Sequence, residues 1–362
     1  MADLRVLIAG GGTGGHIIPA LAVAHELVEH YRADILFVGT ARGLELKLVP
    51  EAGFKLRLVE VGPLNGVSLM TRLRTLAALP GAIRGCHRLL AEFNPGVVLG
   101  VGGYASGPMM HAALRARVPT MVFEPNAMPG MVNRWVGKRV TASAVNFATA
   151  ARWFRASEVT GIPVRPAFFH LPQPESGNPH LLVFGGSQGA RILNTHMPRI
   201  AAQLLDTVPG LTILHQSGSR HLRVTENAYN QSGADPARWQ VQPFIDNMPE
   251  RFGRASLVVA RSGASTVAEL AAAGKPALLV PFAAATDDHQ RKNADAMASA
   301  GGAVVLNEWD LDVEDKLLGT LTGLMSNPAR LATMSTAARS QAHPDAAERI
   351  ARKLAALAGL LG

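Results

Sequence analysis

A histidine directly follows a glycine-rich segment near the start of the chain. Residues 10–16 read GGGTGGH, after an apolar run at 4–9 and before a stretch of helical periodicity. A glycine turn between a strand and a helix lets a ligand approach the backbone, and the free N–H groups at the helix start attract anions. An imidazole exchanges protons near neutral pH. His16 is therefore a candidate general base, and an ordinary histidine at the start of a helix is the alternative.

The same segment matches the dinucleotide-binding pattern G-x-G-x-x-G at Gly10, Gly12 and Gly15. Such a site also needs an acidic residue at the end of the second strand, where it holds the ribose. The predicted second strand, residues 34–38, is instead followed by glycine and threonine. We therefore expect no dinucleotide cofactor.

A second glycine-rich segment, GGSQG at 185–189, lies between an apolar run and another helical stretch. It contains the nucleophile-elbow pattern G-x-S-x-G, and Asp288 and His289 follow in the chain order of hydrolase triads. The hydroxyl of Ser187 and the amides beside it could equally hold a phosphate. A hydrolase would leave the first glycine-rich segment without a role, so we favour phosphate binding.

Polar residues also cluster within residues 261–294. Thr266 and Glu269 have the spacing of a capping box, which would make them purely structural. Farther along, Gln290 and Asn293 share one face of a predicted helix, close to Asp288. Amides and carboxylates just beyond a strand end suit a polyhydroxylated sugar, so this region predicts a sugar site.

The elements that would position these residues alternate along the chain. Short apolar runs, typical of parallel strands covered by helices on both faces, alternate with stretches of helical periodicity. This order predicts an α/β protein with two doubly wound domains. A proline-rich linker is expected at 161–179 and an amphipathic helix at 345–361. The predicted strands are 4–9, 34–38, 97–101, 120–123, 180–184, 211–216, 257–260, 277–280 and 303–306.

Composition limits the class of protein. A length of 362 residues suggests two domains, and 48% hydrophobic with 17% charged residues is incompatible with a disordered chain. The single cysteine excludes a disulfide framework and cysteine-based metal clusters, and we expect no bound metal. The net charge of +8 indicates an anionic partner, but dispersed basic residues and only 5% aromatics disfavour nucleic acid. No signal peptide or unbroken apolar span is visible, so we expect a soluble protein.

Five motifs taken together resemble one family. GGTGGH, GGYASGP, GGSQGARILN, RSGASTVAEL and DDHQRKNA occur in the order and spacing of the MurG family, over nearly the whole chain. That family is the N-acetylglucosaminyltransferase that converts lipid I into lipid II for peptidoglycan synthesis, on the cytoplasmic face of the bacterial plasma membrane. The resemblance implies the GT-B fold, two Rossmann-like doubly wound domains separated by a cleft. It implies an acceptor- and membrane-binding domain at 1–164, to which a C-terminal helix at 343–362 returns, and a UDP-GlcNAc-binding domain at 165–342.

The resemblance also implies a donor site, mostly in the second half. Glu269 would hold the ribose hydroxyls of UDP-GlcNAc, and the backbone of Ile245 would hold the uracil. Gln290, with His289 beside it, would bind the sugar hydroxyls. The residues around the diphosphate would be Arg165, Ser187, Ala264, Ser265 and Thr266.

Residues of the first half would close over the sugar and the acceptor; they are Thr13, Gly14, Gly15 and Asn126. Two positions depart from the family pattern. Ile162 stands where an asparagine often precedes Pro-Val-Arg, and Pro125 replaces a glutamine before Asn126. These departures concern the hinge and the acceptor loop, and leave the donor core intact.

The implied reaction is an inverting displacement without cofactor or metal. His16 would take the proton of the C4 hydroxyl of lipid-linked MurNAc-pentapeptide while that oxygen attacks the anomeric carbon. Backbone amides, a helix N-terminus and Arg165 would stabilise the departing UDP. The alternative is a UDP-sugar epimerase of similar two-domain fold, which would need paired acid and base groups at the sugar.

A lipid-linked acceptor implies contact with an anionic membrane surface. Apolar residues recur at helical spacing within 66–90, with arginines beside them, as interfacial binding requires. The same stripe could instead be buried on the sheet. The predicted membrane-binding residues are Leu69, Met70, Arg72, Leu73, Arg74 and Leu76. The family also implies cell-wall synthesis or division proteins as partners, and roles in cell shape and the cell cycle.

Overall fold

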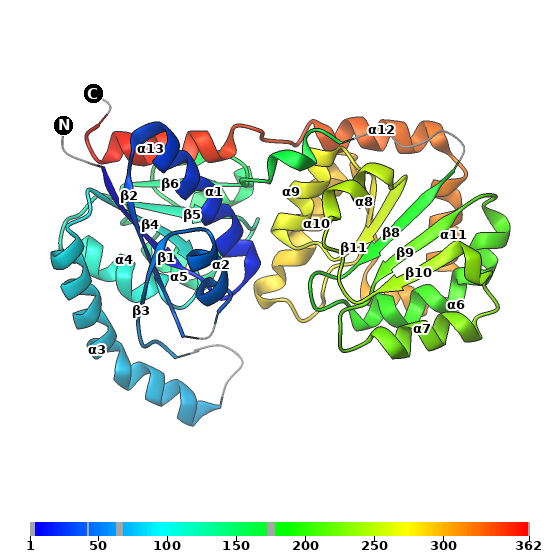
Figure 1. The fold of residues 1–362 in the computed structure, drawn as a ribbon, viewed down its shortest axis with the longest axis horizontal. Coiled ribbons are helices and arrows are strands. Elements are labelled where there is room, and N and C mark those ends of the chain that lie inside the picture. Colours follow the sequence, from blue (N-terminus) through cyan, green and yellow to red (C-terminus); the bar gives the residue numbers. More distant parts are fainter. Residues whose placement is uncertain (1–3, 42, 63–67, 172–177, 361–362) are drawn as a thin grey trace. The chain divides into compact units, whose positions relative to one another are not determined.

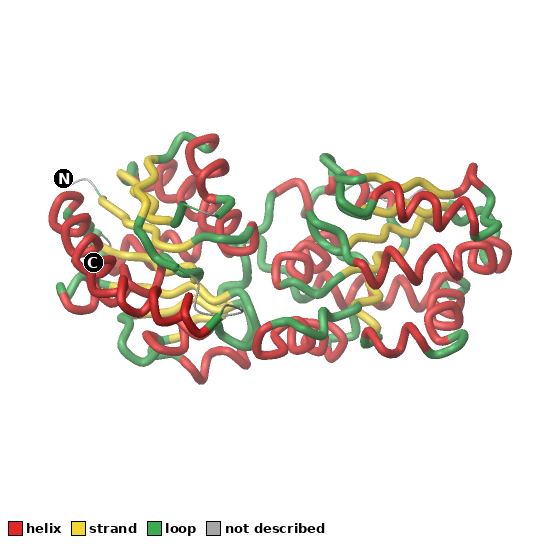
Figure 2. The backbone as a smooth tube through the Cα atoms, turned by 90° about the horizontal axis from the view of Figure 1, so that it is seen from below, coloured by secondary structure: helices red, strands yellow, loops and turns green. Residues whose placement is uncertain are grey.

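The computed structural model describes residues 4–41, 43–62, 68–171 and 178–360, with the backbone alone at 69, 71–73, 76 and 286. The chain divides into two compact units. Unit 1 comprises residues 1–163 and 343–362, and unit 2 comprises residues 164–342. Each unit contains a parallel sheet with helices on both of its faces (Figures 1 and 2). The predicted fold class, two doubly wound α/β domains, is confirmed.

The strands of unit 1 are β1 (Arg5–Gly10), β2 (Asp34–Gly39), β3 (Lys55–Leu58), β4 (Val97–Gly102), β5 (Thr120–Glu124), β6 (Ala142–Val145) and β7 (Ser157–Val159). They pair in the order β3-β2-β1-β4-β5-β6-β7. The helices are α1 (Gly14–Tyr31), α2 (Glu45–Glu51), α3 (Leu69–Phe93), α4 (Ser106–Arg115), α5 (Met131–Val136) and α13 (Ala346–Leu357), with the 3₁₀ helix η1 (Ala148–Trp153). α13, at the end of the chain, packs against α1.

The strands of unit 2 are β8 (His180–Phe184), β9 (Thr212–Gln216), β10 (Trp239–Gln242), β11 (Leu257–Ala260), β12 (Ala277–Leu279) and β13 (Ala303–Val305). They pair in the order β10-β9-β8-β11-β12-β13. The helices are α6 (Arg191–Thr207), α7 (Leu222–Gln231), α8 (Met248–Arg254), α9 (Ala264–Ala273), α10 (His289–Ser299), α11 (Lys316–Met325) and α12 (Pro328–Arg339). Short 3₁₀ helices are η2 (Pro166–Phe168), η3 (Pro236–Arg238), η4 (Thr286–Asp288) and η5 (Glu308–Asp312).

The strand order determines where ligands can bind. In each sheet the direction of winding reverses beside the first strand of the unit, between β1 and β4 in unit 1 and between β8 and β11 in unit 2. Loops at the carboxyl ends of such neighbouring strands separate and leave a crevice for a ligand. Both glycine-rich segments follow the first strand of their unit, and therefore lie at these two switch points.

Four strands are absent from the prediction made from the sequence: β3, β6, β7 and β10. Three of them lie at sheet edges, where one side is open to solvent and polar residues such as those of β10 (WQVQ) are tolerated. β6 (ASAV) is buried throughout, but its small residues give little hydrophobic signal. Apolar runs therefore predict the central strands, but not edge strands with polar residues or a strand of small residues.

Candidate active site

The glycine-rich loop of unit 1 leads from β1 into α1. Thr13 is the N-cap residue of α1 and its side chain is exposed, while Gly14 and Gly15 form the first turn. The neighbouring loop after β4 contacts it, because the N–H of Gly11 donates to the carbonyl oxygen of Gly102 at 3.3 Å. The predicted residues Thr13, Gly14 and Gly15 thus lie at the switch point of unit 1.

His16 lies in the first turn of α1 and is half-buried. Its Nδ1 is 3.1 Å from the carbonyl oxygen of Gly11. A carbonyl oxygen can only accept, so this contact assigns the proton of the neutral ring to Nδ1. The other nitrogen, Nε2, then carries the lone pair, which is the form that a general base requires.

Glu45, at the start of α2, is fully buried beneath the same loop. Its Oε2 accepts the N–H of Gly12 at 2.7 Å, and its Oε1 accepts the N–H and the hydroxyl of Thr40, each at 3.0 Å. An amide that a nucleotide phosphate would use is therefore bound to a carboxylate of the chain itself. Sequence reasoning missed Glu45, although an acidic residue shortly after the second strand was the available signal.

A second buried carboxylate, Glu124, ends β5 and organises the loop that follows. It accepts both the backbone N–H (2.9 Å) and the side-chain amide (3.2 Å) of the predicted acceptor residue Asn126. It also accepts the N–H of Gly130 at 3.0 Å and the side-chain amide of Asn133 at 2.9 Å. Asn126 is thus held in place by Glu124, which sequence reasoning did not single out.

In unit 2, Ser187 lies exposed in the loop between β8 and α6. The nucleophile-elbow interpretation is wrong, since an elbow places its serine in a sharp, strained turn from strand to helix. Here residues 185–190 separate the two elements, and Ser187 does not have a positive φ. An open loop of this kind, which presents a hydroxyl before a helix, suits an anion.

α9 begins at Ala264, after the N-cap residue Gly263. The capping-box interpretation of Thr266 is wrong, because Thr266 is the third residue of the helix and cannot be its N-cap. The hydroxyl of Ser265, in the first turn, is buried and finds no hydrogen-bond partner in the described part of the chain. An unsatisfied hydroxyl beside a helix N-terminus is a further feature that favours an anionic ligand.

Glu269 lies one turn farther along α9, and its carboxylate accepts no hydrogen bond from the residues that the structure describes. Burial raises the pKa of Glu269 to about 7, and the nearby guanidinium of Arg165 partly opposes this rise. Arg165 itself is exposed, with its guanidinium 5.1 Å from the ring centre of Phe168. A partly desolvated carboxylate that lies beside a cation and has no donor among the described residues is well suited to accept hydroxyl groups of a phosphorylated ligand.

Gln216, at the end of β9, connects two of the predicted donor segments. Its side-chain amide donates to the carbonyl oxygen of Gly186 at 2.8 Å, in the Ser187 loop. Its Oε1 accepts the N–H of Ile245 at 2.8 Å. A uracil that bound this N–H would therefore displace Gln216. A polar residue at the end of a buried strand was the signal for Gln216 in the sequence.

His289 and Gln290 begin α10, and both are half-buried. The Oε1 of Gln290 accepts the N–H of Phe282 at 3.0 Å, which orients its amide. Asn293 is fully buried and donates to the carbonyl oxygen of Ser262 at 3.2 Å. The prediction that Asn293 belongs to the sugar site is therefore wrong, because its amide joins α10 to the loop before α9.

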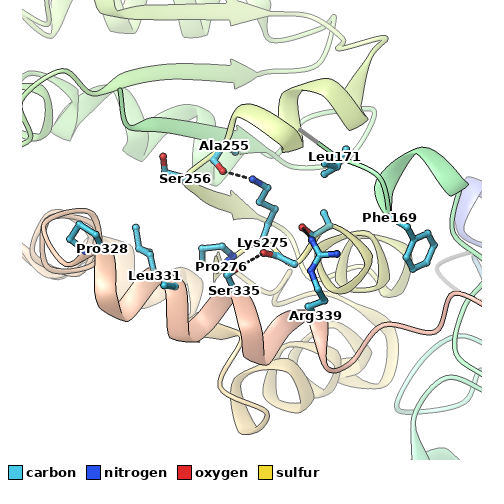
Figure 3. A pocket seen from close by; sticks show the side chains of 13 residues that line it. Phe169, Leu171, Ala255, Ser256, Lys275, Pro276, Pro328, Leu331, Ser335 and Arg339 are labelled. Carbon is cyan, nitrogen blue, oxygen red and sulfur yellow. Dashed lines mark hydrogen bonds between the residues drawn. The ribbon is translucent and has the colours of Figure 1, made fainter. Parts of the chain in front are cut away.

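A cavity of about 530 Å³ lies at the opposite, amino end of the unit 2 strands (Figure 3). Two cations border it, and both are bound to helix ends. Lys275 donates to two carbonyl oxygens at the end of α8, at 2.9 and 3.0 Å. Arg339 donates to the carbonyl oxygen of Ala273, the last residue of α9, at 2.9 Å. Burial, and to a lesser extent Arg339, lowers the pKa of Lys275 to about 8. These contacts satisfy helix C-termini, so we assign no ligand to this cavity.

The predicted membrane-binding residues lie on α3. Met70 (60% exposed) and Arg74 are on its surface, whereas its buried side chains include Thr75, Ala82 and Cys86. The side chains of Leu69, Arg72, Leu73 and Leu76 lie outside the described residues. No described helix is long and apolar enough to cross a bilayer. Nor does any group of three or more His, Cys, Asp or Glu side chains among the described residues have an arrangement that could hold a metal ion.

Both halves of the chain match glycosyltransferase domains. Residues 6–145 match the glycosyltransferase family 28 N-terminal domain, and residues 180–350 match the family 28 C-terminal domain. The crystal structure of MurG from Acinetobacter baumannii is similar with a TM-score of 0.82 and 29% identity, over 97% of this chain and 99% of that one. The structure of a putative UDP-N-acetylglucosamine 2-epimerase from Listeria monocytogenes has a TM-score of 0.69 and 14% identity, over 100% of this chain and 98% of that one. At this identity the similarity shows the fold alone.

Fold and domain matches together define a two-domain glycosyltransferase of the GT-B type. Two relatives named UDP-N-acetylglucosamine--N-acetylmuramyl-(pentapeptide) pyrophosphoryl-undecaprenol N-acetylglucosamine transferase are similar over nearly their whole length. The one from Anaeromyxobacter sp. (strain Fw109-5) is 42% identical over 96% of this chain and 92% of its own length. The one from Myxococcus xanthus is 41% identical over 96% of this chain and 91% of its own length. The chain belongs to the MurG family of these transferases, as its motifs predicted.

Proposed function

We propose that this protein transfers N-acetylglucosamine from UDP-GlcNAc to the C4 hydroxyl of MurNAc in lipid-linked MurNAc-pentapeptide (lipid I), with inversion at the anomeric carbon. The observation that carries the proposal is the similarity to transferases of this name over 96% of the chain. The side chains that this chemistry needs also follow the carboxyl ends of strands in the two sheets. The product is lipid II, the precursor of peptidoglycan.

Unit 2 binds the donor in this proposal. The carboxylate of Glu269 accepts the ribose hydroxyls, and the backbone of Ile245 binds the uracil. Ser187, Ser265 and Arg165 surround the diphosphate, together with the first turn of α9 at Ala264 and Thr266. The hydroxyl of Ser265 is buried and has no hydrogen-bond partner among the described residues, and this supports the assignment, because a phosphate oxygen would satisfy it. His289 and Gln290 bind the sugar hydroxyls.

Unit 1 supplies the acceptor side and the base. Nε2 of His16 takes the proton of the C4 hydroxyl while that oxygen forms a bond to the anomeric carbon. The bond from the anomeric carbon to the phosphate oxygen breaks, and its electron pair leaves with UDP. Arg165 and the N-terminus of α9 stabilise the charge that develops there. Thr13, Gly14, Gly15 and Asn126 line the sugar and the acceptor.

The membrane part of the proposal concerns α3. A polyprenyl-linked acceptor stays in the bilayer, so the enzyme must bind to the cytoplasmic face of the plasma membrane as a peripheral protein. The N-terminal part of α3 extends beyond the rest of unit 1 (Figure 1) and exposes Met70 beside Arg74. An exposed apolar side chain next to a cation suits anionic lipid. Cell-wall synthesis or division proteins are the further partners that we propose.

Transfer of radiolabelled GlcNAc from UDP-GlcNAc to a short-chain lipid I analogue tests the proposed reaction. We expect label in a lipid II analogue that needs both substrates. Conversion of UDP-GlcNAc into another UDP-sugar without acceptor would instead establish the epimerase alternative. A reaction without the lipid I analogue provides the blank.

A further inference from the structure

Glu45 has no part in the reaction just described, yet the loops of unit 1 are shaped around it. Its carboxylate is fully buried and accepts three hydrogen bonds, from Gly12 and Thr40. A Cβ atom on Gly11, Gly39 or Gly43 would collide with its side chain. Three segments of backbone, after β1, at the end of β2 and before α2, thus enclose this carboxylate at close range.

One peptide group joins Glu45 to His16. The N–H of Gly12 and the carbonyl of Gly11 belong to the same peptide bond, whose planar trans geometry directs them to opposite sides. Glu45 Oε2 accepts that N–H at 2.7 Å, and Nδ1 of His16 lies 3.1 Å from that carbonyl oxygen. When the carboxylate fixes the orientation of this peptide, it therefore also fixes the carbonyl oxygen that faces His16.

The negative charge of Glu45 favours the same tautomer of His16 as the position of its carboxylate does. An anion bound to the N–H of a peptide polarises it and makes its carbonyl oxygen a stronger acceptor. A stronger acceptor at Nδ1 favours the Nδ1–H tautomer and leaves Nε2 as the basic nitrogen. The arrangement has the effect of a carboxylate bound directly to a catalytic histidine, with one peptide group between them.

We propose that Glu45 is the positioning residue for His16 and acts through the Gly11–Gly12 peptide to hold the imidazole in its Nδ1–H form. The inference rests on the proposed role of His16 as the base. Glutamine cannot replace Glu45, since its single carbonyl oxygen satisfies one side of the site while its NH₂ group faces a backbone donor on the other. Alanine removes the carboxylate and leaves space for an acetate ion.

Two measurements on the full chain test this proposal. In ¹⁵N NMR spectra of the imidazole nitrogens at pH 8.5, with His16 assigned by its loss in His16→Gln, the wild type should show the Nδ1–H tautomer. Glu45→Gln should show a mixture with the Nε2–H tautomer. In the transfer assay, Glu45→Gln should lower kcat roughly 10–100-fold at unchanged KM for UDP-GlcNAc. Acetate should restore part of the kcat and the Nδ1–H signal of Glu45→Ala.

The matched control is Glu51→Gln, an exposed carboxylate at the other end of α2, which should leave the tautomer and kcat unchanged. A wild-type tautomer in Glu45→Gln, or no response of the Nδ1–H signal of a folded Glu45→Ala variant to acetate, would overturn the proposal. If His16→Ala is impaired, a kcat of Glu45→Gln within twofold of the wild type would overturn it as well. The spectrum does not depend on activity. If His16→Ala kept full activity while the tautomer still changed in Glu45→Gln, His16 would not be the base. The proposal that Glu45 positions His16 would still hold.

Discussion

Gly102 lies so close to His16 that a Cβ atom on Gly102 would be 3.2 Å from Nε2 of the imidazole. β4 ends at this glycine, and its carbonyl oxygen accepts the N–H of Gly11. The loops after β1 and β4 therefore meet at the nitrogen that is proposed to take the proton.

Gly102→Ala should lower kcat roughly 10–100-fold, because the added methyl group displaces the ring from its position for proton transfer. Gly102 also has a φ of +93°, so alanine adds backbone strain of about 1–2 kcal/mol. Gly53→Ala is the matched control, since Gly53 has a φ of +82° and no described atom lies within 4 Å of its Cβ position. Both variants should lose similar thermal stability, and only Gly102→Ala should lose kcat. Equal kcat values would show that the contact with His16 is without consequence.

His16→Ala should lower kcat by about 10²–10⁴ if Nε2 is the general base. The affinity for UDP should stay the same, because the residues proposed to bind the uridine and the diphosphate belong to unit 2. Steady-state kinetics and calorimetric titration with UDP measure the two quantities separately. A loss of less than tenfold would leave His16 with a positioning role.

Glu269→Ala should weaken the binding of UDP and UDP-GlcNAc together. A carboxylate that accepts two hydroxyl groups makes charge-assisted bonds worth roughly 1.5–3 kcal/mol, so the KM for the donor should rise about 10–150-fold. The kcat should change little, since the ribose does not react. If a folded variant had an unchanged KM for the donor, Glu269 would not be the residue that binds the ribose.

Glu269→Gln should stabilise the protein at alkaline pH. The carboxyl group ionises near pH 4.5 when unfolded and near pH 7 when folded, so the stability of the wild type decreases as the pH rises between these values. The difference corresponds to at most about 3 kcal/mol. In urea unfolding at pH 8 the glutamine variant should be the more stable, and at pH 4 the two proteins should be alike. A variant that is less stable at pH 8 would mean that the charge is compensated in the fold.

The double substitution Met70→Asp and Ala77→Asp should abolish co-sedimentation with anionic vesicles and preserve the melting temperature and the UDP affinity. Both residues are exposed on α3, so the carboxylates enter no core, but they repel the anionic surface and remove apolar contact. Val224→Asp, at the most exposed large hydrophobic side chain in unit 2, is the control and should bind vesicles like the wild type. Undiminished vesicle binding by the double variant would place the membrane contact elsewhere.

Local patterns in the sequence were sufficient for the architecture. The central strands, the two glycine-rich turns and the final helix were predicted because apolar runs and helical periodicity reflect burial within one element. The same patterns overlooked β3, β7 and β10, whose edge positions tolerate polar residues, and β6, whose residues are small. The motifs then identified the family, since short segments can be compared in order and spacing without knowledge of their contacts.

Tertiary structure decided which polar side chains have which task. From the sequence, Thr266 had the spacing of a capping box and Asn293 was grouped with the sugar site, and the fold gives each a different place. Thr266 occupies the first turn of α9 at the switch point, and Asn293 is buried as a link between segments. Glu45 and Glu124 carried no recognisable motif, because each acts through backbone groups that are distant in sequence or brought close only by a folded loop. Which backbone amides reach a carboxylate depends on the path of the folded chain and not on residue type. The sequence therefore shows that the two glutamates are present, but it does not show which groups they bind.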